Sequence, residues 1–227
     1  MLLADSCAVI FDLDGVIVDS KDAHEAAFIQ LGREAGYSIS AEQFRDTFGR
    51  RNEEIFPLLY GHPLPEERVR WLADRKEAIF RDMVAGQVTP LPGVRELLPA
   101  LAAAGFHRAL GTSTPRANVE LILRELDLRE YFETIVGSED VNKGKPDPRV
   151  FSLGAERLGI PPALCVVVED AVAGVAAALN GGMKALAVTT NHSRASLHAA
   201  HRVVDSLAEV TPADFLALIE ACAPAPI

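Results

Sequence analysis

The sequence predicts an α/β protein with a Rossmann-like parallel sheet, helices on both faces of that sheet, and an inserted small α-helical domain. Short apolar runs rich in β-forming residues end abruptly in polar residues, and they alternate with helical patterns along most of the chain. From residue 21 to residue 88 this alternation stops, and only amphipathic helical patterns occur. We therefore expect an α/β core of residues 1–20 and 89–227 and a helical domain of residues 21–88.

Apolar runs and helical patterns locate the elements of the core. Strands are expected at residues 7–11, 107–111, 134–136, 164–168 and 184–188, and helices at residues 116–126, 148–158, 172–179 and 213–219. Thr114, Asp147 and Thr211 each precede a proline, the order of capping residue and first-turn proline at a helix start. Alternating strands and helices favour a parallel sheet that binds ligands at the carboxyl ends of its strands.

The inserted segment has helix signals of its own. Residues 24–35 and 66–83 are amphipathic, Gly36 is a typical helix end, and residues 40–43 have the capping-box order that starts another helix. Closely spaced prolines in residues 89–93 predict a stiff linker that leads back into the core.

Composition and charge exclude several classes of function. The 227 residues carry a formal net charge of −10, so the average field of the protein repels nucleic acid, and no polynucleotide partner is expected. No stretch is long and apolar enough for a membrane span, and residues 1–8 lack the features of a signal peptide. The three cysteines have no metal-binding spacing and favour reduced thiols, which predicts a cytoplasmic protein.

The strongest local signal is the apolar run of residues 9–11, which leads directly into Asp12, Leu13, Asp14 and Gly15. Two carboxylates at the end of one strand repel each other unless a cation lies beside them, and an oxygen-rich site of this kind suits Mg²⁺. Gly15 would let the backbone turn sharply and approach a ligand closely. An ordinary turn is the alternative interpretation, because Asp and Gly are common turn residues.

A second apolar run, residues 165–168, ends in the adjacent carboxylates of Glu169 and Asp170. If this strand lies beside the first, Asp170 can complete the oxygen shell that Asp12 begins, while Glu169 orients a bound water or ligates weakly. Asp170 could also cap the helix that follows, and this interpretation is compatible with metal binding.

Two further segments carry groups that suit a phosphate. Thr112 and Ser113 follow a predicted strand and precede a helix, where hydroxyl and amide groups can bind a phosphate oxygen. Lys145 precedes another predicted helix and could neutralise a phosphate or a buried nucleophile. Taken alone, the first feature is also a common helix cap, and the second is also an ordinary surface lysine.

In chain order, the segments FDLDGVIVDS, LGTST, GKPDP and VVVED, the last followed by Ala173 and Gly174, resemble the four motifs of the haloacid dehalogenase superfamily. The helices inserted after the first motif resemble the small helical cap of that family. The resemblance implies that Asp12 attacks phosphorus and forms an aspartyl-phosphate, while Asp14 protonates the leaving oxygen and then activates water.

The resemblance also implies a cofactor and a phosphate site. Mg²⁺ would be held by the Asp12 carboxylate, the Asp14 carbonyl and Asp170, and Thr112 and Lys145 would bind the phosphoryl oxygens. One residue departs from the pattern, because Ala171 stands where relatives commonly carry a serine. We therefore expect a missing hydrogen bond near the metal ligands and weaker orientation of those ligands.

Closure of a cap would exclude water and present groups that select the substrate. The candidates are His24, Arg50, Arg51, Asn52 and Lys76. The spacing of His24 after the first motif is similar to that in β-phosphoglucomutase and several sugar-phosphate phosphatases, where it could support the acid at Asp14. The alternatives are a solvated Arg50–Arg51 pair, an exposed Lys76 and a histidine in the first turn of an exposed helix without a function.

These features predict a Mg²⁺-dependent phosphatase for a small soluble phosphomonoester such as a sugar phosphate, phosphoglycolate or a nucleotide-like ester. Asp14 disfavours dehalogenation, because the dehalogenases of the superfamily lack this acid. Two alternatives stay open: a phosphomutase resembling β-phosphoglucomutase, and a binding protein without turnover. We expect a monomer or a small homo-oligomer, and specificity that depends on cap geometry.

Overall fold

The structure, a computed structural model, describes residues 3–47 and 50–221. Six parallel strands form one sheet in the order β3-β2-β1-β4-β5-β6. Their bounds are β1 Ala8–Phe11, β2 His107–Gly111, β3 Thr134–Val136, β4 Cys165–Glu169, β5 Lys184–Val188 and β6 Arg202–Val204. Because β1 lies between β2 and β4, the residues that follow these three strands meet at the carboxyl edge of the sheet.

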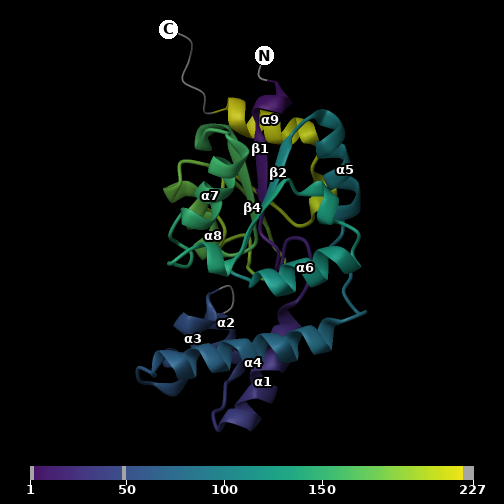
Figure 1. The fold of residues 1–227 in the computed structure, drawn as a ribbon. Helices are drawn as coiled ribbons and strands as arrows, with labels where there is room; N and C mark the ends of the chain where they lie inside the picture. Colours follow the sequence, from purple (N-terminus) through teal and green to yellow (C-terminus); the bar gives the residue numbers. More distant parts are fainter. Residues whose placement is uncertain (1–2, 48–49, 222–227) are drawn as a thin grey trace.

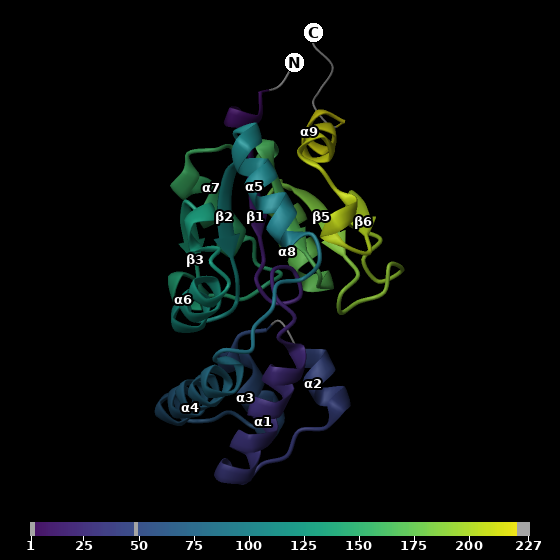
Figure 2. The ribbon, with the colours of Figure 1, turned by 90° about the vertical axis from the view of Figure 1, so that its right-hand side faces the viewer.

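Helices cover both faces of the sheet (Figures 1 and 2). They are α5 Val94–Ala104, α6 Arg116–Glu125, α7 Arg149–Leu158, α8 Val172–Asn180 and α9 Pro212–Glu220. Successive side chains of a strand point to opposite faces, so Phe11 packs in the apolar cluster with α5, α6 and α9, whereas Ile10 packs in the cluster with α7 and α8. This two-sided burial explains why the strands read as continuous apolar runs.

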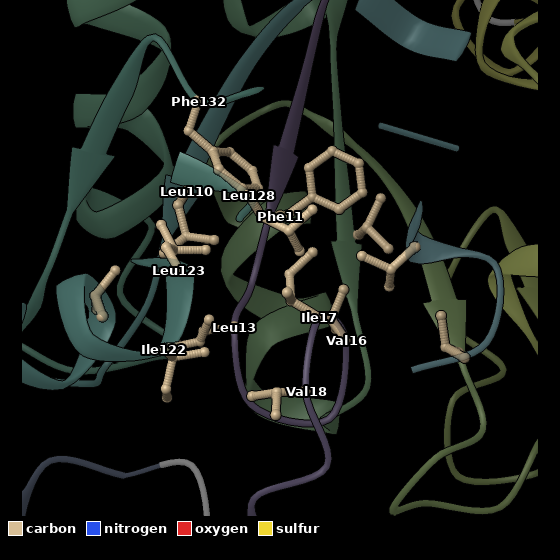
Figure 3. Packing of buried hydrophobic residues seen from close by; sticks show 14 of the residues in the cluster. Phe11, Leu13, Val16, Ile17, Val18, Leu110, Ile122, Leu123, Leu128 and Phe132 are labelled. Atoms are coloured by element: carbon tan, nitrogen blue, oxygen red, sulfur yellow. The ribbon is translucent and has the colours of Figure 1, made fainter. Parts of the chain in front are cut away.

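The apolar cluster on the Phe11 face extends toward the carboxyl edge of the sheet (Figure 3). The rings of Phe11 and Phe132 meet edge to face, with centroids 6.0 Å apart. Leu13 and Ile17, which follow β1, are fully buried in the same cluster. The loop after β1 is therefore anchored by apolar side chains on both sides of its acidic residues.

The described part of residues 21–88 forms a cap of four helices, which lies at the opposite end of the sheet from α9 (Figure 1). They are α1 Lys21–Ala35, α2 Ala41–Thr47, α3 Asn52–Tyr60 and α4 Glu66–Val84. The two connections to the core run side by side, because Leu91 N donates to Ile17 O over 2.9 Å and Val18 forms a bridge with Pro90. The domain boundaries predicted after residues 20 and 88 stay predictions.

Short 3-10 turns complete the described chain, at Ala4–Ser6, Arg129–Tyr131, Ser138–Asp140, Pro162–Leu164 and Leu207–Glu209. Two α-helices and one strand were not predicted from the sequence: α3, α5 and β6. Prolines interrupt the helical pattern of α3 at Pro57 and of α5 at Pro99, and β6 is too short for a clear period. Within residues 3–47 and 50–221, no helix has both the length and the hydropathy that a membrane span needs.

The helix-start signals had different outcomes. Thr211 is the N-cap of α9, and the backbone N–H of Gln43 donates to Ser40 Oγ over 3.1 Å at the start of α2, as predicted. The cap predicted at Thr114 is wrong, because Pro115 is the N-cap of α6 and the Thr114 hydroxyl instead donates to the Asp14 carboxylate.

Candidate active site

The loop after β1 places Asp12 and Asp14 at the carboxyl edge of the sheet. The backbone N–H of Asp12 donates to Val168 O over 3.0 Å, which continues the pairing of β1 with β4 by one residue. Gly15 then adopts a left-handed conformation with φ of +79°, and a Cβ at this position would overlap Asp170 Oδ2. Glycine is thus required here both for the turn and for the close approach to Asp170.

Asp12, Glu169 and Asp170 form a buried acidic cluster. One carboxylate oxygen from each residue lies within 4.8 Å of the others. Lys145 enters this cluster, with Nζ 3.1 Å from Asp12 Oδ2 and 2.6 Å from Glu169 Oε1. The predicted neutralising lysine therefore contacts the predicted nucleophile, and the surface-lysine alternative is wrong because Lys145 is buried.

Burial and neighbouring charges shift the ionisation of this cluster. Burial, which Lys145 opposes and to which Glu169 and Asp14 add, raises the pKa of Asp12 to about 7. The pKa of Asp170 is also raised, first by burial and then by Glu169 and Asp12. Burial would lower the pKa of Lys145, but the two adjacent carboxylates outweigh it and keep the ammonium protonated. The cluster holds more carboxylates than cations.

The donor set fits a hard cation. Asp12 Oδ1 is buried and accepts no hydrogen bond from the residues that the structure describes. Both oxygens of Glu169 are already engaged, since Oε1 lies on Lys145 and Oε2 accepts the backbone N–H groups of Asp170 and Ala171. Asp12 and Asp170 are therefore better placed as metal ligands than Glu169, whose predicted weak ligation is less favoured than an orienting role.

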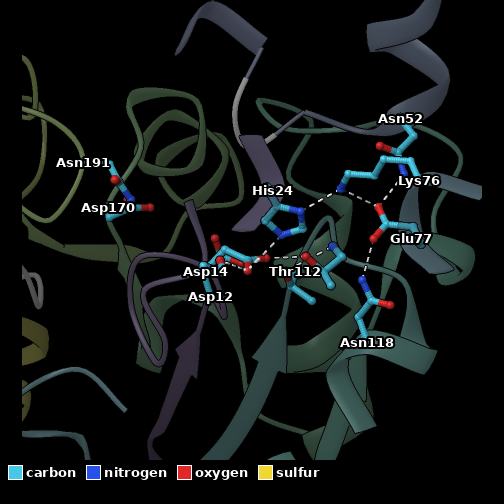
Figure 4. Close-up of polar contacts among 12 residues, drawn as sticks. Asp12, Asp14, His24, Asn52, Lys76, Glu77, Thr112, Asn118, Asp170 and Asn191 are labelled. Carbon is cyan, nitrogen blue, oxygen red and sulfur yellow. Dashed lines mark hydrogen bonds and ion pairs between the residues drawn. The ribbon is translucent and has the colours of Figure 1, made fainter. Parts of the chain in front are cut away.

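Asp14 is turned toward the cap rather than toward the acidic cluster (Figure 4). Its Oδ1 accepts the Ser20 hydroxyl and lies 3.4 Å from His24 Nε2, and its Oδ2 accepts the Thr114 hydroxyl. Burial alone would raise the pKa of Asp14, but the hydrogen bonds and the charge of His24 outweigh it and lower the pKa. Ser20 and Thr114 were not predicted as site residues from the sequence, although both lie within the recognised motifs.

A cavity of about 280 Å³ lies between these residues and the cap. Thr112 and Ser113 line it at the end of β2, and the Thr112 side chain is held by the backbone N–H of Thr114 at 3.2 Å. The cap contributes apolar groups from Phe28, Phe44 and Ile55. A small polar molecule with an apolar edge would match these walls.

Four of the five predicted cap residues line the cavity: His24, Arg50, Asn52 and Lys76. Arg51 is not among the described residues that line it, and its side chain instead lies beside Gly144 of the core. Lys76 is 3% exposed and its Nζ lies 2.7 Å from His24 Nδ1, so the exposed-lysine alternative is wrong.

His24 is not an exposed histidine either. It is buried, and its ring stacks on Phe80 with centroids 3.9 Å apart. Since its two nitrogens face Lys76 and Asp14, His24 links the cap to the carboxylate that follows the first strand. The predicted support of Asp14 by His24 stays a prediction, and the two side chains lie close enough for it.

The model of the haloacid dehalogenase-like hydrolase family matches residues 9–188, which include Asp12, Asp14, Lys145 and Asp170. The chain belongs to this family. The predicted superfamily and the predicted α/β fold with a helical cap are thereby confirmed.

Several phosphatases are similar to this haloacid dehalogenase-like hydrolase. A chloroplastic 5-amino-6-(5-phospho-D-ribitylamino)uracil phosphatase of Arabidopsis thaliana is 32% identical over 213 residues, which are 93% of this chain but 57% of that relative. A phosphorylated carbohydrates phosphatase of Thermotoga maritima is 33% identical over 181 residues, 78% of this chain and 82% of the relative. The chain thus spans little more than half of the plant protein and most of the bacterial one.

A solved structure of β-phosphoglucomutase from Clostridium difficile has the same fold. Its TM-score is 0.85 at 24% identity, and the match covers 97% of this chain and 98% of that chain. At this identity the likeness concerns the fold alone.

In this haloacid dehalogenase-like hydrolase, Asp170 does not cap the helix that follows it, contrary to one prediction. Ala171 is the N-cap of α8, and Asp170 Oδ2 accepts the side-chain amide of Asn191 over 2.7 Å. The Ala171 backbone N–H donates to Glu169 over 2.7 Å, so part of the orientation at this site comes from the main chain. Asn191 and His192 lie in a loop beyond the four motifs, and no sequence signal indicated them.

Proposed function

We propose that the protein is a Mg²⁺-dependent phosphatase that hydrolyses a small phosphomonoester through an aspartyl-phosphate on Asp12. The observation that supports this most directly is Asp12 itself, a buried carboxylate that has Lys145 on one oxygen and no hydrogen-bond donor on the other among the described residues. The predicted enzyme class, a phosphoric monoester hydrolase, is confirmed by the family match and by the phosphatases among the relatives.

In the proposed mechanism, a carboxylate oxygen of Asp12 attacks phosphorus and the ester oxygen leaves on the opposite side. Lys145 stays protonated and offsets negative charge on Asp12 and on the phosphoryl oxygens, while Thr112 and Ser113 donate to those oxygens. When bound, Mg²⁺ would supply further positive charge here, held by Asp12, Asp170 and the carbonyl of Asp14.

Asp14 is the proposed general acid and base. It would protonate the leaving oxygen and then take a proton from the water that hydrolyses the aspartyl-phosphate. In the structure its carboxylate is held by Ser20, Thr114 and His24, which favour the ionised form. We propose that binding of substrate exchanges these contacts for the leaving oxygen, so that the pKa of Asp14 rises in the closed complex.

The cavity supports a compact substrate such as a sugar phosphate. Its volume of about 280 Å³ leaves room for a small polar molecule, and Arg50, Asn52 and Lys76 line its cap side. Relatives named as phosphatases of phosphorylated carbohydrates, hexitol phosphate and fructose 1-phosphate agree with this class of substrate. The cytoplasmic location and the monomeric or small homo-oligomeric state stay predictions.

The first test is phosphate release from a panel of phosphomonoesters by the purified protein, with and without Mg²⁺. We expect Mg²⁺-dependent release that is lost in Asp12→Asn and retained in Asp22→Asn, a matched change at an exposed carboxylate on α1. Phosphate release that persists in Asp12→Asn would show that Asp12 is not the nucleophile. Absence of release together with isomerisation of a sugar phosphate would instead favour the phosphomutase alternative.

A second test separates the roles of the two aspartates. An activated ester such as p-nitrophenyl phosphate has a leaving group that needs no proton, so Asp14→Asn should still be phosphorylated on Asp12 and give a stoichiometric burst of nitrophenol. Turnover after the burst should be slow, because no base activates water. A variant without a burst would contradict the division of roles.

A further inference from the structure

Asn118 joins the core to the cap through two hydrogen bonds of opposite direction, and Figure 4 shows the one to Glu77. It lies on α6 of the core and is fully buried. Its amide nitrogen donates to Glu77 Oε2 over 2.5 Å, and its amide oxygen accepts from Arg81 Nη1 over 2.8 Å. Glu77 and Arg81 are four residues apart on α4 and so lie on one face of that helix, where they bracket the amide.

The contact of Asn118 with Glu77 and Arg81 continues into the polar groups that reach Asp14. Glu77 Oε1 accepts from Lys76 Nζ over 2.9 Å and from the side-chain amide of Asn52 over 2.6 Å. Lys76 Nζ lies 2.7 Å from His24 Nδ1, and His24 Nε2 faces Asp14. A shift of α4 away from α6 would therefore displace Lys76 and His24 relative to the core.

Burial distinguishes this contact from the exposed hydrogen bonds between cap and core. Glu77 is 6% exposed and Asn118 is fully buried, so separation without water access would leave Glu77 Oε2 and the Asn118 amide unsatisfied. Burial alone would raise the pKa of Glu77, but Lys76, His24 and Asn52 outweigh it and lower the pKa, so Glu77 accepts as a carboxylate. By contrast, Gly144 N reaches Glu54 Oε1 of the cap over 3.3 Å at an exposed position.

We propose that Asn118 is a positioning residue that holds α4 of the cap against the core and thereby sets the positions of Lys76 and His24 relative to Asp14. This contact needs an amide, because the amide nitrogen must donate to a carboxylate while the amide oxygen accepts from a guanidinium. The catalytic part of this inference rests on the proposed function, whereas the structural part, the docking of the cap, does not.

The experiment exchanges the donor and the acceptor across the contact. Asn118→Asp keeps the acceptor for Arg81 but sets a second carboxylate against Glu77, and it should loosen the cap. The double variant Glu77→Gln with Asn118→Asp restores one donor and one acceptor and leaves the total charge unchanged, so it should restore docking. Gln87→Glu, the same amide-to-carboxylate change at an exposed site, is the matched control.

Kinetics with two leaving groups give the first readout. For Asn118→Asp we expect kcat/KM to fall by about tenfold or more on an alkyl phosphate from the panel, since a hydrogen bond to a charged group is lost and a repulsion is added. The fall should be several-fold smaller on p-nitrophenyl phosphate, whose departure does not depend on Asp14. A residue with a merely structural role would lower both activities alike.

Small-angle X-ray scattering gives the second readout and needs no substrate. Asn118→Asp should have a larger radius of gyration than the wild type and Gln87→Glu, and the double variant should return to the wild-type value. If the wild type releases no phosphate, scattering still tests whether Asn118 holds the cap against the core. If Asn118→Asp does not fold, Asn118→Ser takes its place, because it removes the hydrogen bonds to Glu77 and Arg81 without adding charge. An unchanged radius in a folded variant, or a double variant no better than Asn118→Asp, would overturn the proposal.

Discussion

Gly174 lies against Glu169 so closely that a Cβ on Gly174 would overlap the carboxylate oxygen that binds Lys145. The glycine is in the first turn of α8, and the Glu169 side chain folds back over that turn to accept the N–H groups of Asp170 and Ala171. The missing side chain of Gly174 thus determines where Glu169, and through it Lys145, can lie.

Gly174→Ala should therefore displace Glu169 and misplace Lys145. We expect a loss of roughly a hundredfold in kcat/KM, as for misplacement of a charged group by about 1 Å, and a loss of about 1–3 kcal/mol in the free energy of unfolding. Steady-state kinetics and urea unfolding measure the two effects. Gly154→Ala is the matched control, because Gly154 is also in a helix but its Cβ would meet neighbours no nearer than 3.6 Å, and it should be neutral or stabilising.

Removal of the Lys145 charge should destabilise the protein. Lys145→Met leaves Asp12 and Glu169 buried without their ammonium partner, which costs about 3–5 kcal/mol for a broken buried ion pair. Unfolding in urea with EDTA present measures this cost, and added Mg²⁺ should recover part of it. Lys143→Met, an exposed change two residues earlier, should be neutral. Equal stability of the two variants would show that Lys145 does not neutralise the cluster.

Gly93, the last residue of the linker, should tolerate no side chain. Its φ is +90°, and a Cβ would overlap the backbone N of Ala208. Gly93→Ala combines left-handed strain with a backbone clash and should cost about 3 kcal/mol or more in unfolding free energy. Gly159 has a φ of +72° with nothing within 4 Å of the added Cβ, so Gly159→Ala should cost only about 1 kcal/mol. Thermal unfolding of both variants separates the clash from the strain.

The ion pair of Asp214 with Arg202 should contribute stability that depends on pH. Hydrogen bonds from Arg202 and Thr211 lower the pKa of Asp214 to about 2, below its ordinary value of 3.8. A lowered carboxyl pKa stabilises the folded state above the unfolded-state pKa, and this contribution is lost as pH falls from about 4 to about 2. Asp214→Asn should cost about 1 kcal/mol at pH 7. Urea titrations at decreasing pH should show the gap between variant and wild type closing below pH 4.

Much of the candidate site could be predicted because the chemistry lies in short contiguous segments at strand ends. The apolar runs before Asp12, Thr112 and Glu169 indicated buried parallel strands, and parallel strands carry the residues after them to one edge of the sheet. The elements that were missed, such as α5 and β6, had weak or interrupted periods and depend on packing against the rest of the fold.

The partners of these residues depended on contacts far apart in the sequence. Thr114 gave the signal of a helix cap, yet its hydroxyl bonds to Asp14, 100 residues earlier in the chain. Asn118 and Glu77 carry no motif, and they pair because α4 of the cap packs against α6 of the core. A single sequence reports local propensity and spacing, but not which buried polar groups must satisfy each other.

By itself, the sequence determined the family and the α/β core with its helical insertion, and it predicted the residues that we propose carry the chemistry, because these depend on periodicity and on residue types at strand ends. The tertiary structure decided that Lys145 pairs with Asp12 and Glu169, that Lys76 and His24 are buried, and that Arg51 lies outside the cavity. The physical reason is that burial and charge pairing belong to the packed chain, where the cost of an unpaired buried group selects one arrangement among many.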